Sequence, residues 1–216
     1  MLMKTLGYIL QGTGVTIAVT LVALPMGFLI GLILSIVRVY SGKAASAAAG
    51  IYSTVMRGVP PLVLLFILYF IISGSINLSP FWAGSLSLGI ISSGYQLEIL
   101  RGALQSVGSS QMMAARALGM TRIEAIRYII LPQALRIVIP SWANEASVVL
   151  KDSSLVYALG VPEIIRRAQY ISASTYEPFL ALSAAAIIYF VLVFATNRFL
   201  DLLEARVRVP GLELSR

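Results

Sequence analysis

The feature that most constrains this chain is an unbroken run without charge near its N-terminus. No Asp, Glu, Lys or Arg occurs from Thr5 to Val37, and a second uncharged run extends from Gly58 to Leu97. A helix that spans a bilayer needs about 20 mostly apolar residues, whereas a cleaved signal peptide has an apolar region of only about 7–15 residues. The first run therefore predicts a retained membrane-spanning helix, and the second is long enough for two.

The composition agrees with a membrane protein and excludes several kinds of chemistry. Hydrophobic residues make up 58% of the 216 residues and charged residues only 12%, against about 25% charged in a typical soluble domain. The sequence contains no Cys and no His, which excludes disulfide scaffolds, Cys- or His-ligated metal sites and Ser-His catalysis. The net charge of +7 lies in no basic run with interleaved aromatics, so we expect no nucleic-acid partner.

Five apolar segments organise the chain. We predict an all-α integral membrane protein with about five transmembrane helices, forming one domain over residues 1–216. The predicted segments are Thr5–Val37, 47–73, 81–101, Ile129–Leu150 and Pro178–Asn197. A turn at Ser73–Pro80 separates the second segment from the third, and Pro132 and Pro140 interrupt the fourth. Within the first segment, Gly27 and Gly31 indicate either a close helix contact or an ordinary small-residue face.

The loop between the third and fourth segments, at about residues 103–128, is amphipathic. We predict two short helices there. The first ends at Gly119, a residue type typical of helix C-termini. The second begins at Thr121, whose spacing to Glu124 is that of a capping box.

Basic residues indicate the orientation in the membrane, because Lys and Arg accumulate on the cytoplasmic side. With the N-terminus outside, only Lys4, Lys151, Arg166 and Arg167 lie outside. The other twelve are then cytoplasmic: Arg38, Lys43, Arg57, Arg101, Arg116, Arg122, Arg127, Arg136, Arg198, Arg206, Arg208 and Arg216. We therefore expect a multi-pass protein of the cytoplasmic membrane whose C-terminus is in the cytoplasm.

The amphipathic loop carries a long motif. Ala114 and Ala115 are followed by three residues, Gly119, nine residues, and then Ile129-Ile130-Leu131-Pro132. This pattern resembles the coupling-loop signature of ABC importer permeases, which is Glu-Ala-Ala, three residues, Gly, nine residues and Ile-x-Leu-Pro. One position departs from the signature, since Met113 stands where the family usually has Glu. Met113 cannot complete a capping box with Ser110, which costs the first short helix about 0.5–1 kcal/mol.

Further segments resemble the polar amino-acid subfamily of these permeases. They are Gly12-Thr13, Arg57–Pro60, Tyr95–Gly102, Leu131–Arg136 and Lys151–Leu155. Departures are Val59 for Thr, Pro61 for Leu, Leu64 for Gln and Ser153 for Thr.

The resemblance implies a permease subunit of a type I ABC importer that moves polar amino acids by alternating access. It implies a second permease chain, identical or related, two separate ATPase subunits that hold ATP and Mg, and an extracytoplasmic amino-acid-binding protein. The residues that would couple this chain to the ATPase are Met113, Ala114, Ala115, Gly119, Ile129, Leu131 and Pro132.

No phosphate-binding loop is found in the sequence. The nearest match, Ser41-Gly42-Lys43-Ala44, lacks the Ser or Thr of such a loop, so we expect no enzyme activity and no cofactor on this chain. The alternative interpretation of the amphipathic loop is a helix pair lying on lipid.

Ionisable residues in or beside membrane segments are costly and often line a transport pathway. The candidates are Glu98, Asn144, Glu145, Lys151 and Asp152. Asn144 and Glu145 lie in the Pro-interrupted segment, where irregular backbone is expected beside a cavity. For Glu98 the alternative is an ion pair with Arg101, three residues further on.

The alternative function of the protein is an ion-coupled secondary transporter or channel. Such a protein is expected to contain internal inverted repeats, and we find no repeat. An intramembrane protease is disfavoured, because the chain has no His and its only aspartates are Asp152 and Asp201.

Overall fold

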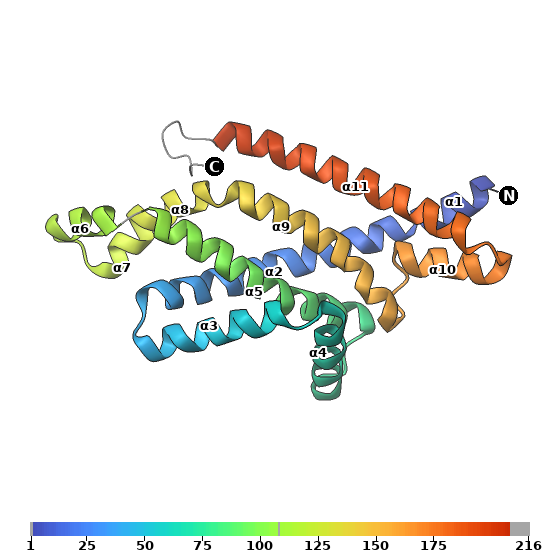
Figure 1. Ribbon diagram of the computed structural model, residues 1–216, viewed down its shortest axis with the longest axis horizontal. Helices are drawn as coiled ribbons and strands as arrows, with labels where there is room; N and C mark the ends of the chain where they lie inside the picture. The colour runs from blue at the N-terminus through green and yellow to red at the C-terminus, as the bar shows by residue number, and fades with distance from the viewer. Residues whose placement is uncertain (1, 108, 208–216) are drawn as a thin grey trace.

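The structure is a computed structural model that describes residues 2–107 and 109–207. Most of these residues are helical and none of them forms a strand (Figure 1), which confirms the all-α prediction. Arg208 and Arg216, counted in the orientation argument, lie outside the described residues. The elements are α1 (Leu2–Leu10), α2 (Gly12–Tyr40), α3 (Lys43–Gly58), α4 (Pro61–Ser75), α5 (Pro80–Ser106), α6 (Ser109–Ala117), α7 (Arg122–Glu124), the π-helix η1 (Ala125–Ile130), α8 (Leu131–Ile137), α9 (Ile139–Asp152), the 3-10 helix η2 (Ser153–Leu159), α10 (Ile164–Thr175) and α11 (Pro178–Val207).

Two stretches of helix are long and apolar enough to cross a membrane unaided. They are Leu6–Tyr40, with 35 residues, and Pro178–Arg206, with 29 residues. Helix α5 has 27 residues, which at 1.5 Å per residue is also long enough to span. Its sequence is richer in Ser and Gly, and most of its side chains are buried between neighbouring helices. The number of five spans stays a prediction.

The predicted continuous helix over residues 47–73 is wrong, because the chain turns sharply between α3 and α4. The two helix axes differ by 114°, and α4 points away from the long axis of the bundle (Figure 1). Val59 and Pro60 have extended ψ angles of 139° and 131°. Each of these residues precedes a proline, whose ring disfavours the helical conformation of the residue before it. The Pro60-Pro61 pair therefore ends α3 and begins α4.

The predicted interruption of the fourth segment at Pro132 and Pro140 is confirmed. A new helix begins at each proline, since Pro132 and Pro140 lie in the first turns of α8 and α9 respectively, a position typical of proline. The π-helix η1 leads directly into α8, and the side-chain amide of Gln133 donates to the carbonyl of Ile129 at 2.8 Å. Only Val138 separates α8 from α9, and its backbone angles remain helical. Glu145 therefore lies in a regular helix and not in irregular backbone.

The close contact between α2 and α5 organises the bundle. A Cβ on Gly27 would lie 2.6 Å from the Gln96 side-chain nitrogen, and one on Gly31 would lie 2.9 Å from the backbone nitrogen of Leu97. Gly89 of α5 faces the carbonyl of Ala23 in the same way, at 3.1 Å. The close-contact interpretation of the glycine pair is thereby confirmed. Around this contact, Val19, Leu65, Leu88, Ile91 and Val149 form a buried apolar cluster.

Replacing Gly31 by Ala should destabilise the bundle, because the added methyl group meets backbone and α2 must move away from α5. We expect a loss of about 1–3 kcal/mol, typical of overpacking, measured as a lower unfolding temperature of the detergent-solubilised protein. Gly14→Ala is the matched control in the same helix, since nothing lies within 4 Å of its added Cβ. Equal unfolding temperatures for the two variants would contradict the packing account.

Candidate functional site

The helix pair α6–α7 forms a hairpin at one end of the bundle, opposite the N-terminus (Figure 1). Gly119 has a φ of +85°, a backbone conformation that favours glycine. The N–H of Gly119 donates to the carbonyl of Arg116, and the N–H of Met120 donates to that of Ala115, both at 3.1 Å. This pair of hydrogen bonds is a Schellman motif. It confirms that α6 closes at Gly119, and it fixes the reversal of the chain.

The second arm of the hairpin begins with the predicted capping box. The N–H of Glu124 donates to Thr121 Oγ1 at 3.3 Å, and the N–H of Thr121 donates to Glu124 Oε2 at 2.7 Å. Hydrogen bonds from the backbone and hydroxyl of Thr121 hold the pKa of the Glu124 carboxyl below its usual value. The carboxylate therefore stays ionised at neutral pH, and it stabilises the helix start.

Apolar side chains form the tip of the hairpin. Met113 is 65% exposed, Leu118 84% and Ile123 77%. Ala114 is exposed beside them, whereas Ala115 is buried against the rest of the loop. We call Met113, Ala114, Leu118 and Ile123 the tip surface. An exposed apolar surface of this kind marks a site of contact with another protein or with a membrane.

The remaining motif residues lie at the root of the hairpin. Ile129 and Leu131 are half-buried and Pro132 is exposed, so these three residues connect the loop to α8 and do not reach the tip. The guanidinium of Arg122 lies over the ring of Tyr40, 5.6 Å from its centre. This contact joins the second arm to the end of α2.

A buried polar network connects three helices in the middle of the bundle. Glu145 on α9 is 5% exposed, and its Oε1 accepts a hydrogen bond from Ser92 of α5 at 2.7 Å. The Gln96 side-chain nitrogen donates to Ser92 Oγ at 3.0 Å and to the backbone carbonyl of Leu24 on α2 at 3.2 Å. The indole N–H of Trp142 donates to Gln96 Oε1 at 2.9 Å. The network therefore fixes the relative positions of α2, α5 and α9.

One oxygen of the buried carboxylate remains available. Glu145 Oε2 accepts no hydrogen bond from the residues that the structure describes. A carboxylate can accept several hydrogen bonds, so this oxygen has the capacity for a further donor.

Of the other pathway candidates, only Asp152 acts electrostatically on Glu145, and it lies two turns further along α9. Asn144 is exposed on a different face of α9, and Lys151 is exposed at its end. Asp152 is half-buried. Glu98 binds two arginines: its Oε2 lies 2.7 Å from Arg101 Nε and its Oε1 lies 3.6 Å from Arg38 Nε. The ion-pair interpretation of Glu98 is confirmed, and a role for it in transport stays a prediction.

The Glu98 ion pairs help to fasten the hairpin end of the bundle. Arg38 also donates from Nη1 to the carbonyl of Ser46 at 2.9 Å, and Ser46 Oγ donates to the carbonyl of Arg38 at 2.7 Å. The guanidinium lies directly against Gly50, where any Cβ would collide with it. Arg38 therefore joins α2 to both α3 and α5.

Sequence reasoning missed a second buried carboxylate at the opposite end. Glu163 is fully buried and caps α10, since its two oxygens accept the N–H groups of Ile165 and Arg166 at 2.8 and 2.7 Å. The hydroxyl of Tyr189 on α11 donates to Glu163 Oε2 at 2.8 Å. The capping role of Glu163 could have been predicted from its position just before a helix. Its contact with Tyr189 could not, because 26 residues separate the two.

Comparison with known proteins identifies what this architecture is. Residues 6–209 match the family described as binding-protein-dependent transport system inner membrane component. The chain belongs to this family. It is therefore a permease of a type I ABC importer, a class that works with an ATPase and a substrate-binding protein.

Individual relatives cover almost the whole chain. The octopine transport system permease protein OccQ of Agrobacterium tumefaciens (strain Ach5) is 34% identical over 214 residues, which are 93% of this chain and 90% of that protein. The putative glutamine transport system permease protein GlnP of Rickettsia felis is 34% identical over 205 residues and covers 94% of each chain.

Solved structures agree with the fold. The crystal structure of an amino acid ABC transporter with histidines matches at a TM-score of 0.84 and 36% identity, covering 94% of this chain and 96% of that chain. An inward-facing structure of the MetNI methionine ABC transporter also matches at a TM-score of 0.84, over 94% of this chain and 97% of that chain. Its identity is 17%, so it is informative about the fold alone.

Replacing Thr121 by Ala should loosen the second arm of the hairpin, because the N-cap hydroxyl is lost. We expect a local cost of about 1 kcal/mol, seen as about fivefold faster hydrogen exchange at the amides of residues 123–125. Thr121→Ser keeps the hydroxyl and should exchange like the unchanged protein. Unaltered exchange in Thr121→Ala would mean that the capping box does not order this arm.

Proposed function

We propose that this chain is the permease subunit of an importer for polar amino acids, with ATP and Mg held on separate ATPase subunits. The observation that carries the proposal is the rigidly capped helix hairpin, whose apolar tip surface projects from the end of a membrane bundle of this family. A capped hairpin keeps its shape when a partner pushes on it, so it suits the transfer of movement. The assembly would contain two permease chains, two ATPase subunits and an extracytoplasmic amino-acid-binding protein.

Movement of the hairpin has a direct route into the bundle. Its second arm continues through η1 and α8 into α9, which carries Glu145. Its contact with Tyr40 connects it to the end of α2. Closing of the ATPase subunits would shift the equilibrium between outward-open and inward-open arrangements, because nucleotide binds the two arrangements with different affinity.

The substrate class follows from the relatives and from the buried carboxylate. Relatives are named for octopine, glutamine and amino acid transport. In this chain we propose Glu145 as the pathway residue that meets a polar group of the substrate. Since Glu145 is almost fully buried within one chain, access to it requires the helices to separate, which fits transport by alternating access. The hairpin would lie in the cytoplasm and the N-terminus outside, as the distribution of Lys and Arg favours.

Co-purification tests the proposed assembly. A tag on this chain is used to isolate the native complex in detergent, and the subunits are identified and weighed. We expect an ATPase subunit and a total mass near that of two permeases and two ATPases. A chain that purifies without an ATPase would contradict the proposal and favour an ion-coupled transporter.

The structure corrects the predicted capping pair of Ser110 and position 113, because α6 begins at Ser109 and Ser110 therefore lies inside the helix and not at its N-cap. Replacing Met113 by Glu adds no cap and tests only whether docking needs the acidic residue of the family signature. We expect the ratio of transport to ATP hydrolysis to stay within about twofold of the unchanged protein. Met113→Gln, which has the same length without charge, is the matched control. A large loss of coupling in both variants would contradict the expectation that docking already holds α6 in place.

Replacing Glu145 by Gln should slow transport without releasing the ATPase subunits. A hydrogen bond to a charged group contributes about 1.5–3 kcal/mol, so we expect the transport rate to fall about tenfold. Glu177→Gln makes the same change at an exposed position and should have no effect. The measurements are substrate uptake into vesicles and co-purification of the ATPase. Unaltered uptake in Glu145→Gln would remove Glu145 from the pathway.

A further inference from the structure

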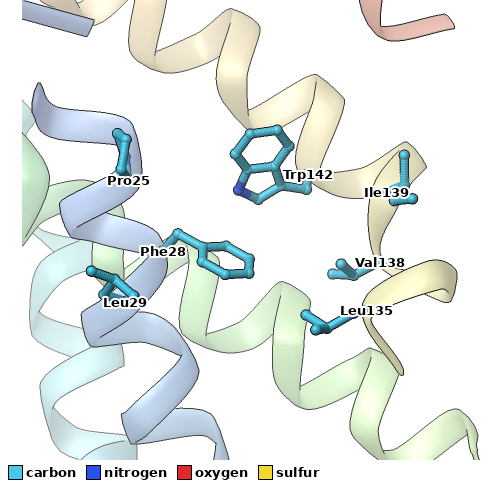
Figure 2. Close-up of a pocket in the computed structure, with 7 residues that line it drawn as sticks. All are labelled: Pro25, Phe28, Leu29, Leu135, Val138, Ile139 and Trp142. Carbon is cyan, nitrogen blue, oxygen red and sulfur yellow. The ribbon is translucent and has the colours of Figure 1, made fainter. Parts of the chain in front are cut away.

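An apolar groove lies between α2 and the α8–α9 segment, outside the sites described above. Its volume is about 460 Å³, within the range of about 300–1,000 Å³ that is typical of small-molecule sites. One wall of the groove is formed by Pro25, Phe28 and Leu29 of α2, and the other by Leu135, Val138, Ile139 and Trp142 of α8 and α9 (Figure 2). The only polar group on this lining, the Trp142 indole N–H, is already bound to Gln96. The groove therefore offers no hydrogen bond and suits a purely apolar occupant.

The position of the groove along α2 puts it deep in the membrane. Pro25 lies 13 residues from the start of α2 at Gly12 and 15 residues from its end at Tyr40, which is about 20 Å from either end. The neighbouring α2 side chains Leu21, Leu29 and Ile33 are each at least 60% exposed. A row of exposed apolar side chains at this depth is suited to contact with acyl chains. One turn of a membrane-spanning helix occupies about 400–600 Å³. The groove has room for only one such turn, so it suits a single acyl chain better than a helix of another protein.

A single cation stands beside the groove, toward the hairpin end of the bundle. Arg136 on α8 precedes Ile139 by three residues, which places the two on the same helix face. Arg136 is exposed, and within residues 2–107 and 109–207 its guanidinium makes no salt bridge. A long Arg side chain in a membrane helix extends toward the membrane surface. Arg136 therefore places a positive charge on the hairpin side of the apolar groove.

We propose that this groove is a binding site for one anionic phospholipid. An acyl chain lies against Phe28, Val138 and Trp142, and the phosphate binds Arg136. Basic groups next to pockets between membrane helices are suited to anionic headgroups. The bound chain would fill the gap between α2 and α9, so the two helices would pack through a lipid at this point.

Fluorescence quenching of Trp142 tests the proposal, because the protein has only two tryptophans. Trp82 is 49% exposed at the start of α5 and is removed by Trp82→Phe. This variant is reconstituted as the full chain in phosphatidylcholine vesicles with increasing amounts of acyl-chain-brominated phosphatidylglycerol or phosphatidylcholine. The double variant Trp82→Phe/Trp142→Phe supplies the background. We expect the brominated phosphatidylglycerol to reach half-maximal quenching at about three- to fivefold lower mole fraction, as one added cation near the surface predicts.

A second substitution separates headgroup binding from simple contact with lipid. Arg136→Gln in the Trp82→Phe background should make the two brominated lipids quench equally. Arg198→Gln is the matched control, since Arg198 is also exposed but lies on α11, and the preference for phosphatidylglycerol should remain.

Three results would overturn the proposal. Equal quenching by the two lipids with Arg136 present would mean that the groove does not select an anionic headgroup. A preference that persists in Arg136→Gln would assign the selectivity to another residue. Trp142 fluorescence insensitive to both lipids would mean that protein, such as a second copy of this chain, covers the groove.

Discussion

The structure depends on the close approach of α2 and α5. Glycines at Gly27, Gly31 and Gly89 let the two backbones meet, and small residues are the usual means by which membrane helices pack. Polar groups then face one another at short range, so the Gln96 amide can reach a backbone carbonyl of α2 and the Ser92 hydroxyl at once. Ser92 in turn donates to Glu145, so α9 is joined to the pair of α2 and α5.

Polar interactions that are costly in a membrane divide into three levels along the bundle. Glu163 and Tyr189 hold α10 and α11 together at one end. Glu145, Ser92 and Gln96 hold the middle. Glu98 and its two arginines fasten the end next to the hairpin. Each level joins a different set of helices, so a change at the hairpin can reach the middle of the bundle through α8 and α9 while α10 and α11 remain joined.

Local features were predictable from the sequence, and long-range ones were not. The reversal at Gly119 and the capping box at Thr121 involve residues at most five apart, so their spacing alone predicted them. The break after Val59 was also encoded locally, by Pro60-Pro61, but the uninterrupted apolar run favoured a continuous helix. Ser92 and Glu145 are separated by 53 residues, and only the folded bundle brings them together. The same holds for Arg38 and Glu98, whereas the Glu98–Arg101 pair follows from helical spacing.

The π-helix at the root of the hairpin sets the direction in which the hairpin faces. Over Ala125–Ile130 the backbone is wound more loosely than an α-helix, as is typical of single π turns inserted into α-helices. Each residue of an α-helix advances the chain by about 100° around the axis. Rewinding η1 as α-helix would therefore turn the tip surface around the axis of α9 by a large angle without bending the helix. The winding of these few residues therefore determines the angle at which the bundle presents the tip surface to a protein that binds the hairpin.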